Sequence, residues 1–266
     1  MHAIVCIKQV PDTTEVKINP ETNTLVREGI ASIINPFDTY AIEEALRLKE
    51  KFGGKVTVLS MGPLQAREAL KEAIAMGADE GVLLSDRAFA GSDTWATAYT
   101  LSQAIRRLAP FDVILCGKQA IDGDTGQVGP GIARQLQIPQ LTYICRLQEF
   151  DPVARRIRVE RLLEEGREIV SCSLPALLTV VKDINQPRYP TFMGIRRATR
   201  LEIPVWGAQA LPDANPAYLG LSGSPTQVVR IFNPPARAGK VLLITGDTPA
   251  DMASQLAERL LGDKVI

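Results

Sequence analysis

The stretch FDVILCGKQAIDGDTGQVGPGIARQL, residues 111–136, reads as a strand, a loop and a helix in that order. Residues 111–117 form an apolar run that is typical of a buried strand. Glycine-rich sequence follows over 117–131, and apolar residues at helical spacing predict a helix over 127–136. Because this succession is the repeating unit of parallel sheets covered by helices, the stretch predicts an α/β fold.

The same alternation recurs before and after this stretch. Strand-like runs cover residues 3–10, 55–62, 81–85 and 140–147, and helical spacing covers 36–52, 64–76 and 93–108. We therefore expect a Rossmann-like parallel sheet with strand order 3-2-1-4-5. In that order the first and fourth strands are neighbours, so the turns that follow Cys6 and Cys116 meet at the ligand-binding edge.

The remaining segments predict additions to this sheet. Residues 11–34 indicate an inserted hairpin with its turn near 19–23. Consecutive strand-like runs at 155–162, 167–174 and 176–183 indicate antiparallel additions. We expect a nucleotide-binding domain over 1–185 and an extended arm over 186–266, because residues 186–235 hold eight of the 18 prolines. Residues 240–262 predict a strand and a capped helix that anchor the arm.

Composition excludes several classes of function. Thirty basic and thirty acidic residues balance, so nothing global favours nucleic acid or an anionic membrane as a partner. No apolar run approaches the roughly 18 residues of a membrane span, and no signal peptide is evident, so we expect a cytoplasmic protein. The four cysteines lack metal-ligand spacing and His2 is the only histidine. We therefore expect no metal site and no catalytic residue, and difficult chemistry would come from a cofactor.

The glycine-rich loop is a candidate phosphate site. Gly123, Gly126 and Gly129 would let the main chain approach a ligand, and the start of helix 127–136 offers unpaired amides. The spacing is neither a P-loop nor GxGxxG, which counts against ATP hydrolysis and a dinucleotide fingerprint. Asp122 and Asp124 suit ribose hydroxyls, an adenine amino group or the loop's own amides. A plain strand-to-helix turn is the alternative interpretation.

A second candidate segment is SDTWAT, residues 92–97. Asp93, Thr94 and Thr97 fall at the first turn of helix 93–108, where hydroxyls and amides can hold an anion or a polar ring edge. Simple capping by Ser92 or Asp93 explains the segment equally well. At the first helix, Asn35 is expected to cap 36–52 and Asp38 to reach back to a free amide.

Six motifs together resemble the β subunit of electron-transfer flavoproteins. They are VCIKQVPDT, INPFD, AMGADEGVLLSDR, GKQAIDGDTGQVGP, LPALLTV and NQPRYPTFMGIRRA, spread over nearly the whole chain. The resemblance implies a heterodimer with an α subunit that carries FAD, and a pocket in this chain that holds AMP or a second FAD. The residues it implies as contacts are Cys6, Asn35, Pro36, Phe37, Asp38, Met61, Asp122, Gly123, Asp124, Thr125, Gly126, Gln127 and Val128.

Two segments resemble the electron-bifurcating branch of that family. They are FAGSDTWAT, residues 89–97, and GLSGSPTQVVRIFNPP, residues 220–235. This resemblance implies FAD in the pocket and NADH as hydride donor. One electron would go to ferredoxin or flavodoxin, and the other through the α-subunit FAD to an acyl-CoA or lactate-type dehydrogenase. The alternative is the AMP-holding relative, a passive electron carrier.

The arm contains PRYPTFMGIRRATR, residues 187–200, which resembles the family's recognition loop for the partner dehydrogenase. Phe192 occupies the position of the apolar anchor in that loop. Arg188, Arg196 and Arg197 surround it and could steer an acidic partner surface. The alternative is a basic loop that packs on its own domain.

Overall fold

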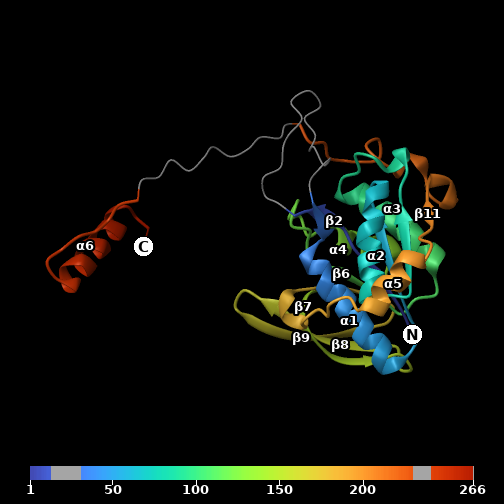
Figure 1. Cartoon of the computed structure of the whole chain (residues 1–266), viewed down its shortest axis with the longest axis horizontal. Coiled ribbons are helices and arrows are strands. Elements are labelled where there is room, and N and C mark those ends of the chain that lie inside the picture. Colours follow the sequence, from blue (N-terminus) through green and yellow to red (C-terminus); the bar gives the residue numbers. More distant parts are fainter. Residues whose placement is uncertain (13–30, 230–240, 266) are drawn as a thin grey trace. The chain divides into compact units, whose positions relative to one another are not determined.

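The computed structural model describes residues 1–12, 31–229 and 241–265, in two compact units, Met1–Arg230 and Ile231–Ile266 (Figure 1). The strands of the first unit are β1 His2–Cys6, β2 Gln9–Pro11, β3 Ser32–Ile34, β4 Lys55–Met61, β5 Glu80–Leu84, β6 Val113–Gly117, β7 Gln140–Asp151, β8 Arg156–Leu163, β9 Gly166–Ser173, β10 Ala176–Val180 and β11 Val205–Trp206. Its α-helices are α1 Pro36–Phe52, α2 Arg67–Met76, α3 Thr94–Leu108, α4 Val128–Leu136 and α5 Phe192–Arg200.

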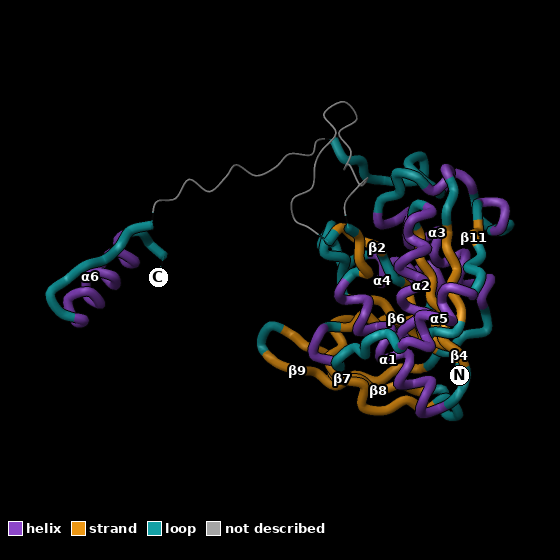
Figure 2. Tube along the Cα trace, viewed as in Figure 1, coloured by secondary structure: helices purple, strands orange, loops and turns teal. Residues whose placement is uncertain are grey.

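A nine-stranded sheet, ordered β11-β5-β4-β1-β6-β10-β7-β8-β9, forms the centre of the first unit (Figure 2). Its strands from β11 to β7 pair in parallel, β8 pairs antiparallel with β7, and β9 pairs antiparallel with β8. The expected α/β fold class is confirmed, as is the adjacency of the third, second, first and fourth predicted strands. The ends of β1 and β6 therefore lie side by side.

Helices cover both faces of the sheet, because each buries one apolar stripe. On one face, Ala41, Ile42 and Ala45 of α1 join Leu70 and Ile74 of α2 in one buried cluster. On the other face, α3 and α4 bury their own apolar residues against β1 and β6. The connection between β1 and β4 runs through α1 on one face, and that between β5 and β6 runs through α3 on the other face. The sheet therefore has its switch point at β1, which is where α/β proteins bind ligands.

Strand β10 corrects one part of the predicted order. It was expected among antiparallel additions, but it inserts in parallel between β6 and β7, so the fourth and fifth predicted strands are not neighbours. Its residues Ala176–Val180 are all buried and apolar or small, which suits a strand covered on both faces. The run at 3–10 also divides, because β1 ends at Cys6 and β2 pairs with β3 instead.

The flanks of the expected hairpin at 11–34 do pair, as β2 and β3, while its turn near 19–23 lies outside the described residues. Residues 186–229 contain α5 and β11 and belong to the first unit, so the structure divides the chain after Arg230 and not after residue 185. That the arm 186–266 wraps an α subunit stays a prediction.

The second unit contains α6, Pro249–Gly262, which begins with a capping box formed by Thr248 and Asp251. This confirms the capped helix expected near the C-terminus. The strand expected before it does not form within residues 241–265. A lone extended segment has no ladder of hydrogen bonds to stabilise it. Within the described parts of the chain, no helix is long and apolar enough to cross a membrane.

Candidate nucleotide site

The carboxyl ends of β1 and β6 bring two predicted residues together. Cys6 and Cys116 are register partners on these neighbouring strands, and both are buried. A hydrogen bond that the two thiols share, together with burial, raises the pKa of Cys116. Both cysteines are free thiols beneath the glycine-rich loop, in the position that the strand order predicted.

Asn35 fixes this loop and does not cap its helix, which corrects the sequence prediction. It occupies the position before α1, but its side chain makes no capping hydrogen bond. Instead its Nδ2 donates to the Gln119 carbonyl at 2.8 Å, and its Oδ1 accepts from the Ile121 amide at 3.1 Å. The side chain is almost completely buried, so it holds the first half of the loop from below.

Asp38 lies between the ends of the two strands. Its Oδ2 accepts from the Lys8 amide at 2.7 Å and its Oδ1 from the Gly117 amide at 3.1 Å. The expected reach back to a free amide at the start of α1 is wrong, because the two amides that Asp38 accepts belong to the segments after β1 and at the end of β6. Burial raises the pKa of this carboxyl to about 7, although these hydrogen bonds favour its charged form. A Cβ on Gly117 would lie 2.6 Å from Phe37 Cβ, so only glycine permits this close approach.

The two acids of the loop have partners within the chain. Asp122 accepts both of its hydrogen bonds from Lys8 Nζ, at 2.7 and 2.8 Å. Asp124, with a left-handed φ of 53°, accepts from Gln119 Nε2 at 2.6 Å. Asp122 is thus charge-compensated and Asp124 is hydrogen-bonded, so both acids have partners within the predicted phosphate-binding loop. Sequence analysis quoted Lys8 and Gln119 only within family motifs and predicted no role for them, because their partners in the loop are set by the folded structure.

Helix α4 begins without a side-chain cap, as a phosphate site requires. Gln127 precedes it and makes no capping hydrogen bond, unlike the residues before α3, α5 and α6. No described atom lies within 4 Å of a Cβ built on Gly123, so the main chain there faces open space. Gly126 has a φ of 62°, and Thr125 is exposed beside it. Val128 and Gly129 form the first turn of the helix, and Gly129 packs on Thr179.

The SDTWAT segment lies close to this loop. Asp93 caps α3, because its Oδ1 accepts from the Trp95 and Ala96 amides at 2.9 and 3.0 Å. Thr94 Oγ1 donates to Gln127 Oε1 at 2.9 Å and so joins α3 to the start of α4. Thr97 is half-buried in the same first turn. Capping therefore accounts for Asp93, while Thr94 and Thr97 stay predicted ligand contacts.

The second oxygen of Asp93 holds a distant segment. Its Oδ2 accepts from both the amide and the hydroxyl of Thr226, at 2.9 and 2.8 Å, and the Asp93 amide donates to Ser224 Oγ at 2.8 Å. Burial alone would raise the pKa of Asp93, but its hydrogen bonds outweigh burial and lower the pKa. Sequence analysis noted the 220–235 segment only for its family resemblance and did not predict these contacts. Asp93 is 131 residues from Ser224 and 133 residues from Thr226 in the chain.

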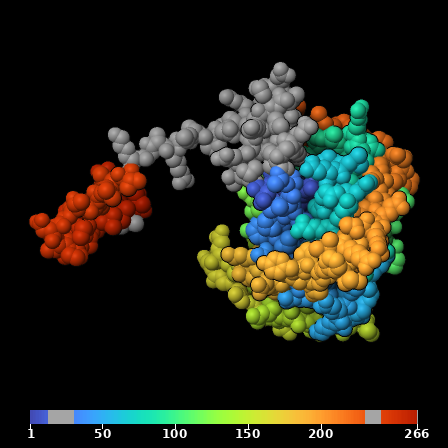
Figure 3. All heavy atoms as spheres, viewed as in Figure 1, coloured from blue at the N-terminus to red at the C-terminus, as the bar shows by residue number. Residues whose placement is uncertain are grey.

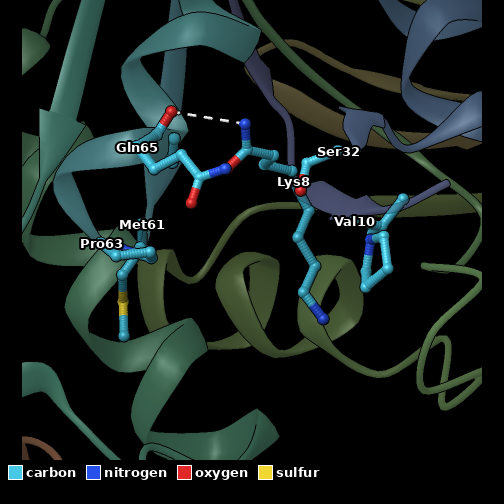
Figure 4. Close-up of a pocket in the computed structure, with 10 residues that line it drawn as sticks. Lys8, Val10, Ser32, Met61, Pro63 and Gln65 are labelled. Carbon is cyan, nitrogen blue, oxygen red and sulfur yellow. Dashed lines mark hydrogen bonds between the residues drawn. The ribbon is translucent and has the colours of Figure 1, made fainter. Parts of the chain in front are cut away.

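Met61 ends β4 and lies across from Lys8 in a small pocket of about 40 Å³ (Figure 4). Gln65 closes the pocket through its carbonyl, which accepts from Gln9 Nε2 at 3.3 Å. The pocket borders the switch point, but its size suits water and not a nucleotide. Pro36 starts α1 and is exposed, and Phe37 beside it is half-buried.

The expected recognition loop is a helix, α5, that lies across the surface of the unit and packs on α2 (Figure 3). Phe192 is 80% exposed at its start, and Arg196 is exposed as well. Arg188 instead binds Glu43, with 2.8 Å from Nε to Oε2, and also binds Glu50. Arg197 Nη2 donates to the carbonyl of Ile74 in the last turn of α2, at 3.0 Å, and to that of Ala78 after the helix.

These contacts change the predicted roles of the basic residues. Arg188 and Arg197 hold α5 and the segment before it on their own domain, as the alternative interpretation expected. Phe192 and Arg196 have exposed side chains, so they stay predicted partner contacts. Arg188 has a different role from the predicted one, because its guanidinium binds Glu43 of α1, which is buried.

Comparison with known proteins now identifies the family. The electron transfer flavoprotein domain matches residues 22–211. An electron transfer flavoprotein subunit beta of Thermoanaerobacterium thermosaccharolyticum is 52% identical and one of Megasphaera elsdenii is 49% identical, each with 100% of both chains covered. Subunit CarD of the caffeyl-CoA reductase-Etf complex of Acetobacterium woodii is 47% identical with the same coverage. The chain therefore belongs to the β-subunit family of electron transfer flavoproteins.

Proposed function

We propose that this chain is the β subunit of an electron-bifurcating electron transfer flavoprotein of the cytoplasm, with FAD bound at the switch point. Family membership supplies the coarser part: such β subunits pair with an α subunit and act in electron transfer with a flavin- or nucleotide-type cofactor. The choice of FAD over AMP, and bifurcation itself, are our own inference from the contacts described above.

The observation that carries this proposal is the hydrogen-bonded unit of Asp93, Ser224 and Thr226. The two segments that resemble the bifurcating branch contact each other in this unit. Thr94 then connects it to Gln127 at the start of α4. A site built from both segments and the loop 117–128 extends further than the loop alone, which favours the larger ligand, FAD.

The residues present fit a phosphate-bearing cofactor. The uncapped start of α4 would bind a phosphate through the amides of Val128 and Gly129, and Gly123 leaves room for it. Asn35 keeps the loop in this shape. Bound FAD would accept a hydride from NADH and pass its two electrons on singly, one to ferredoxin or flavodoxin and the other to the FAD of the α subunit.

For the terminal partner we propose an acyl-CoA or lactate-type dehydrogenase. The name of the 47% identical CarD, a subunit of a caffeyl-CoA reductase-Etf complex, supports the acyl-CoA class. Phe192 is the anchor we expect to enter such a partner, because it is 80% exposed on a helix that Arg188 and Arg197 hold in place. Arg196 would meet acidic groups around it.

Titration of the purified heterodimer with NADH tests the proposal. We expect NADH to reduce flavin in the wild type, and Thr226→Val to lower both flavin content and NADH-dependent reduction. Thr199→Val is the matched control, because its hydroxyl donates to the Arg196 carbonyl within α5 and, among the described residues, to nothing else. A wild-type heterodimer whose flavin NADH does not reduce would contradict the proposal.

A further inference from the structure

Lys118 is the one basic residue of the 117–128 loop, and its ammonium group has no ion-pair partner among the described residues. Asp122 is paired with Lys8, and Asp124 is bound by Gln119. Lys118 Nζ has no hydrogen bond or ion pair to any residue in the ranges 1–12, 31–229 and 241–265. Its main chain is fixed nevertheless, because its amide donates to the Val180 carbonyl at 2.9 Å.

Two aromatic rings hold the Lys118 ammonium group. Its Nζ lies 5.0 Å from the centre of the Phe37 ring and 5.8 Å from that of Tyr143. Both distances are within the range of attraction between a cation and a ring face. Lys118 is half-buried between them, so part of its hydration shell is replaced by weakly polar ring faces. An ammonium group in this setting gains strongly from an anionic partner.

Tyr143 reaches this position through an unfavourable backbone conformation. Its φ of 58° is left-handed, in β7 where the pairing with β10 shifts register. Its amide donates to Thr179 Oγ1 at 3.3 Å, and Thr179 Cγ2 would lie 2.7 Å from a Cβ on Gly129. Tyr143 is therefore next to the first turn of α4. A strained, 47% exposed aromatic residue beside a binding site indicates a functional constraint.

We propose that Lys118 binds a phosphate group of the nucleotide, with Phe37 and Tyr143 as positioning residues for its ammonium group. This inference rests on the nucleotide site of the proposed function and names a contact that the glycine-rich loop alone does not supply. The uncapped amides of α4 and the ammonium group would approach the same anion from two sides. It also explains how a loop with two aspartates accepts phosphate.

Binding measurements on the heterodimer, stripped of the nucleotide of this chain, test the inference. The probes are FAD, AMP and adenosine, which has no phosphate. We expect Lys118→Met to weaken FAD and AMP by about 10- to 100-fold and to leave adenosine unchanged. Lys118→Arg should stay within about 3-fold of the wild type, because it keeps the charge. Lys71→Met is the matched control, because this half-buried lysine of α2 pairs with Glu68 of its own helix, and it should bind all three probes normally.

The outcomes separate this inference from the proposed function. A wild type that binds neither FAD nor AMP would refute the nucleotide site and the inference together. A wild type that binds them, with Lys118→Met unchanged, would refute the inference alone. Equal weakening of adenosine would also overturn it, because Lys118 would then act on the shape of the site and not on phosphate.

Tyr143→Gly tests the positioning role, because it relieves the left-handed strain and removes the ring. We expect it to melt no lower than the wild type and to bind AMP about 3- to 5-fold more weakly. Gln137→Gly, at a φ of 57° after α4, is the matched control and should bind AMP normally. Normal AMP binding by Tyr143→Gly would contradict the positioning role.

Discussion

Replacement of Asp38 by asparagine should invert the order of stability between variant and wild type as pH rises. The carboxyl group accepts the amides of Lys8 and Gly117, one on each oxygen, at the buried junction of β1, β6 and α1. At low pH the folded Asp38 is protonated, but its carbonyl oxygen and its hydroxyl oxygen can both still accept a hydrogen bond. An asparagine accepts only through its carbonyl oxygen and turns its NH2 group toward the second backbone amide. At low pH we therefore expect Asp38→Asn to be less stable by about 1–3 kcal/mol.

The pH dependence follows from the raised pKa of Asp38. Burial moves this pKa from 3.8 to about 7 in the folded chain. Between these values the folded chain keeps a proton that the unfolded chain has released, so the free energy of unfolding falls as pH rises. At about 1.4 kcal/mol for each pH unit, the loss reaches about 4 kcal/mol above pH 7. Asparagine has no such loss, so Asp38→Asn should be the more stable protein at pH 8.

Urea denaturation at several pH values between 4 and 8 measures this effect as the difference between wild type and Asp38→Asn. Taking the difference cancels the other titrating groups that the two proteins share. Asp213→Asn, at an exposed loop position, is the control and should track the wild type throughout. A difference between wild type and Asp38→Asn that stays constant with pH would refute the reasoning.

Three further predictions concern the segment before α5, its exposed anchor and the base of the loop. Arg188→Met should lower the free energy of unfolding by about 2–4 kcal/mol in urea denaturation, because it removes the main partner of the buried Glu43. Burial alone would raise the pKa of Glu43, but hydrogen bonds from Arg188 and Arg47 outweigh burial and lower the pKa. The stability that the Arg188–Glu43 pair contributes should therefore be present at neutral pH and vanish in acid. An equal loss of stability in acid and at neutral pH would contradict this. Phe192→Ala should change stability by less than about 0.5 kcal/mol and leave flavin content normal, while stopped-flow transfer to the dehydrogenase slows; unchanged transfer would exclude the anchor role. Gly117→Ala should lower the melting temperature, because its Cβ would overlap Phe37 and Asp38; an unchanged melting temperature would show that α1 can move away.

The sequence predicted those parts of the fold that depend on local pattern. Residues 36–52 read as a helix because apolar side chains recur at helical spacing after a proline, and α1 has these bounds. The meeting of Cys6 and Cys116 also followed, because parallel topology fixes which strand ends are neighbours. Strand β10 did not follow, because an apolar run shows burial on both faces and not which two strands will flank it.

The contacts of the site were harder to predict because they join segments far apart in the chain. The pairing of Lys8 with Asp122 spans 114 residues, and that of Asp93 with Thr226 spans 133. Asn35 lies at the N-cap position of α1, so the sequence predicted that it caps the helix. Only the folded structure shows that its side chain binds the Gln119 carbonyl of the loop instead. Arg188 was predicted to bind a partner protein for a similar reason, because the sequence shows its charge but not its ion pair with Glu43.

The FAD and AMP content of the purified heterodimer tests the central claim most directly. The chain is co-expressed with its α subunit, and released nucleotides are separated and quantified for each heterodimer. The proposed function predicts two FAD and no AMP. One FAD with one AMP would contradict it, and would make this chain the AMP-holding scaffold of a passive electron carrier.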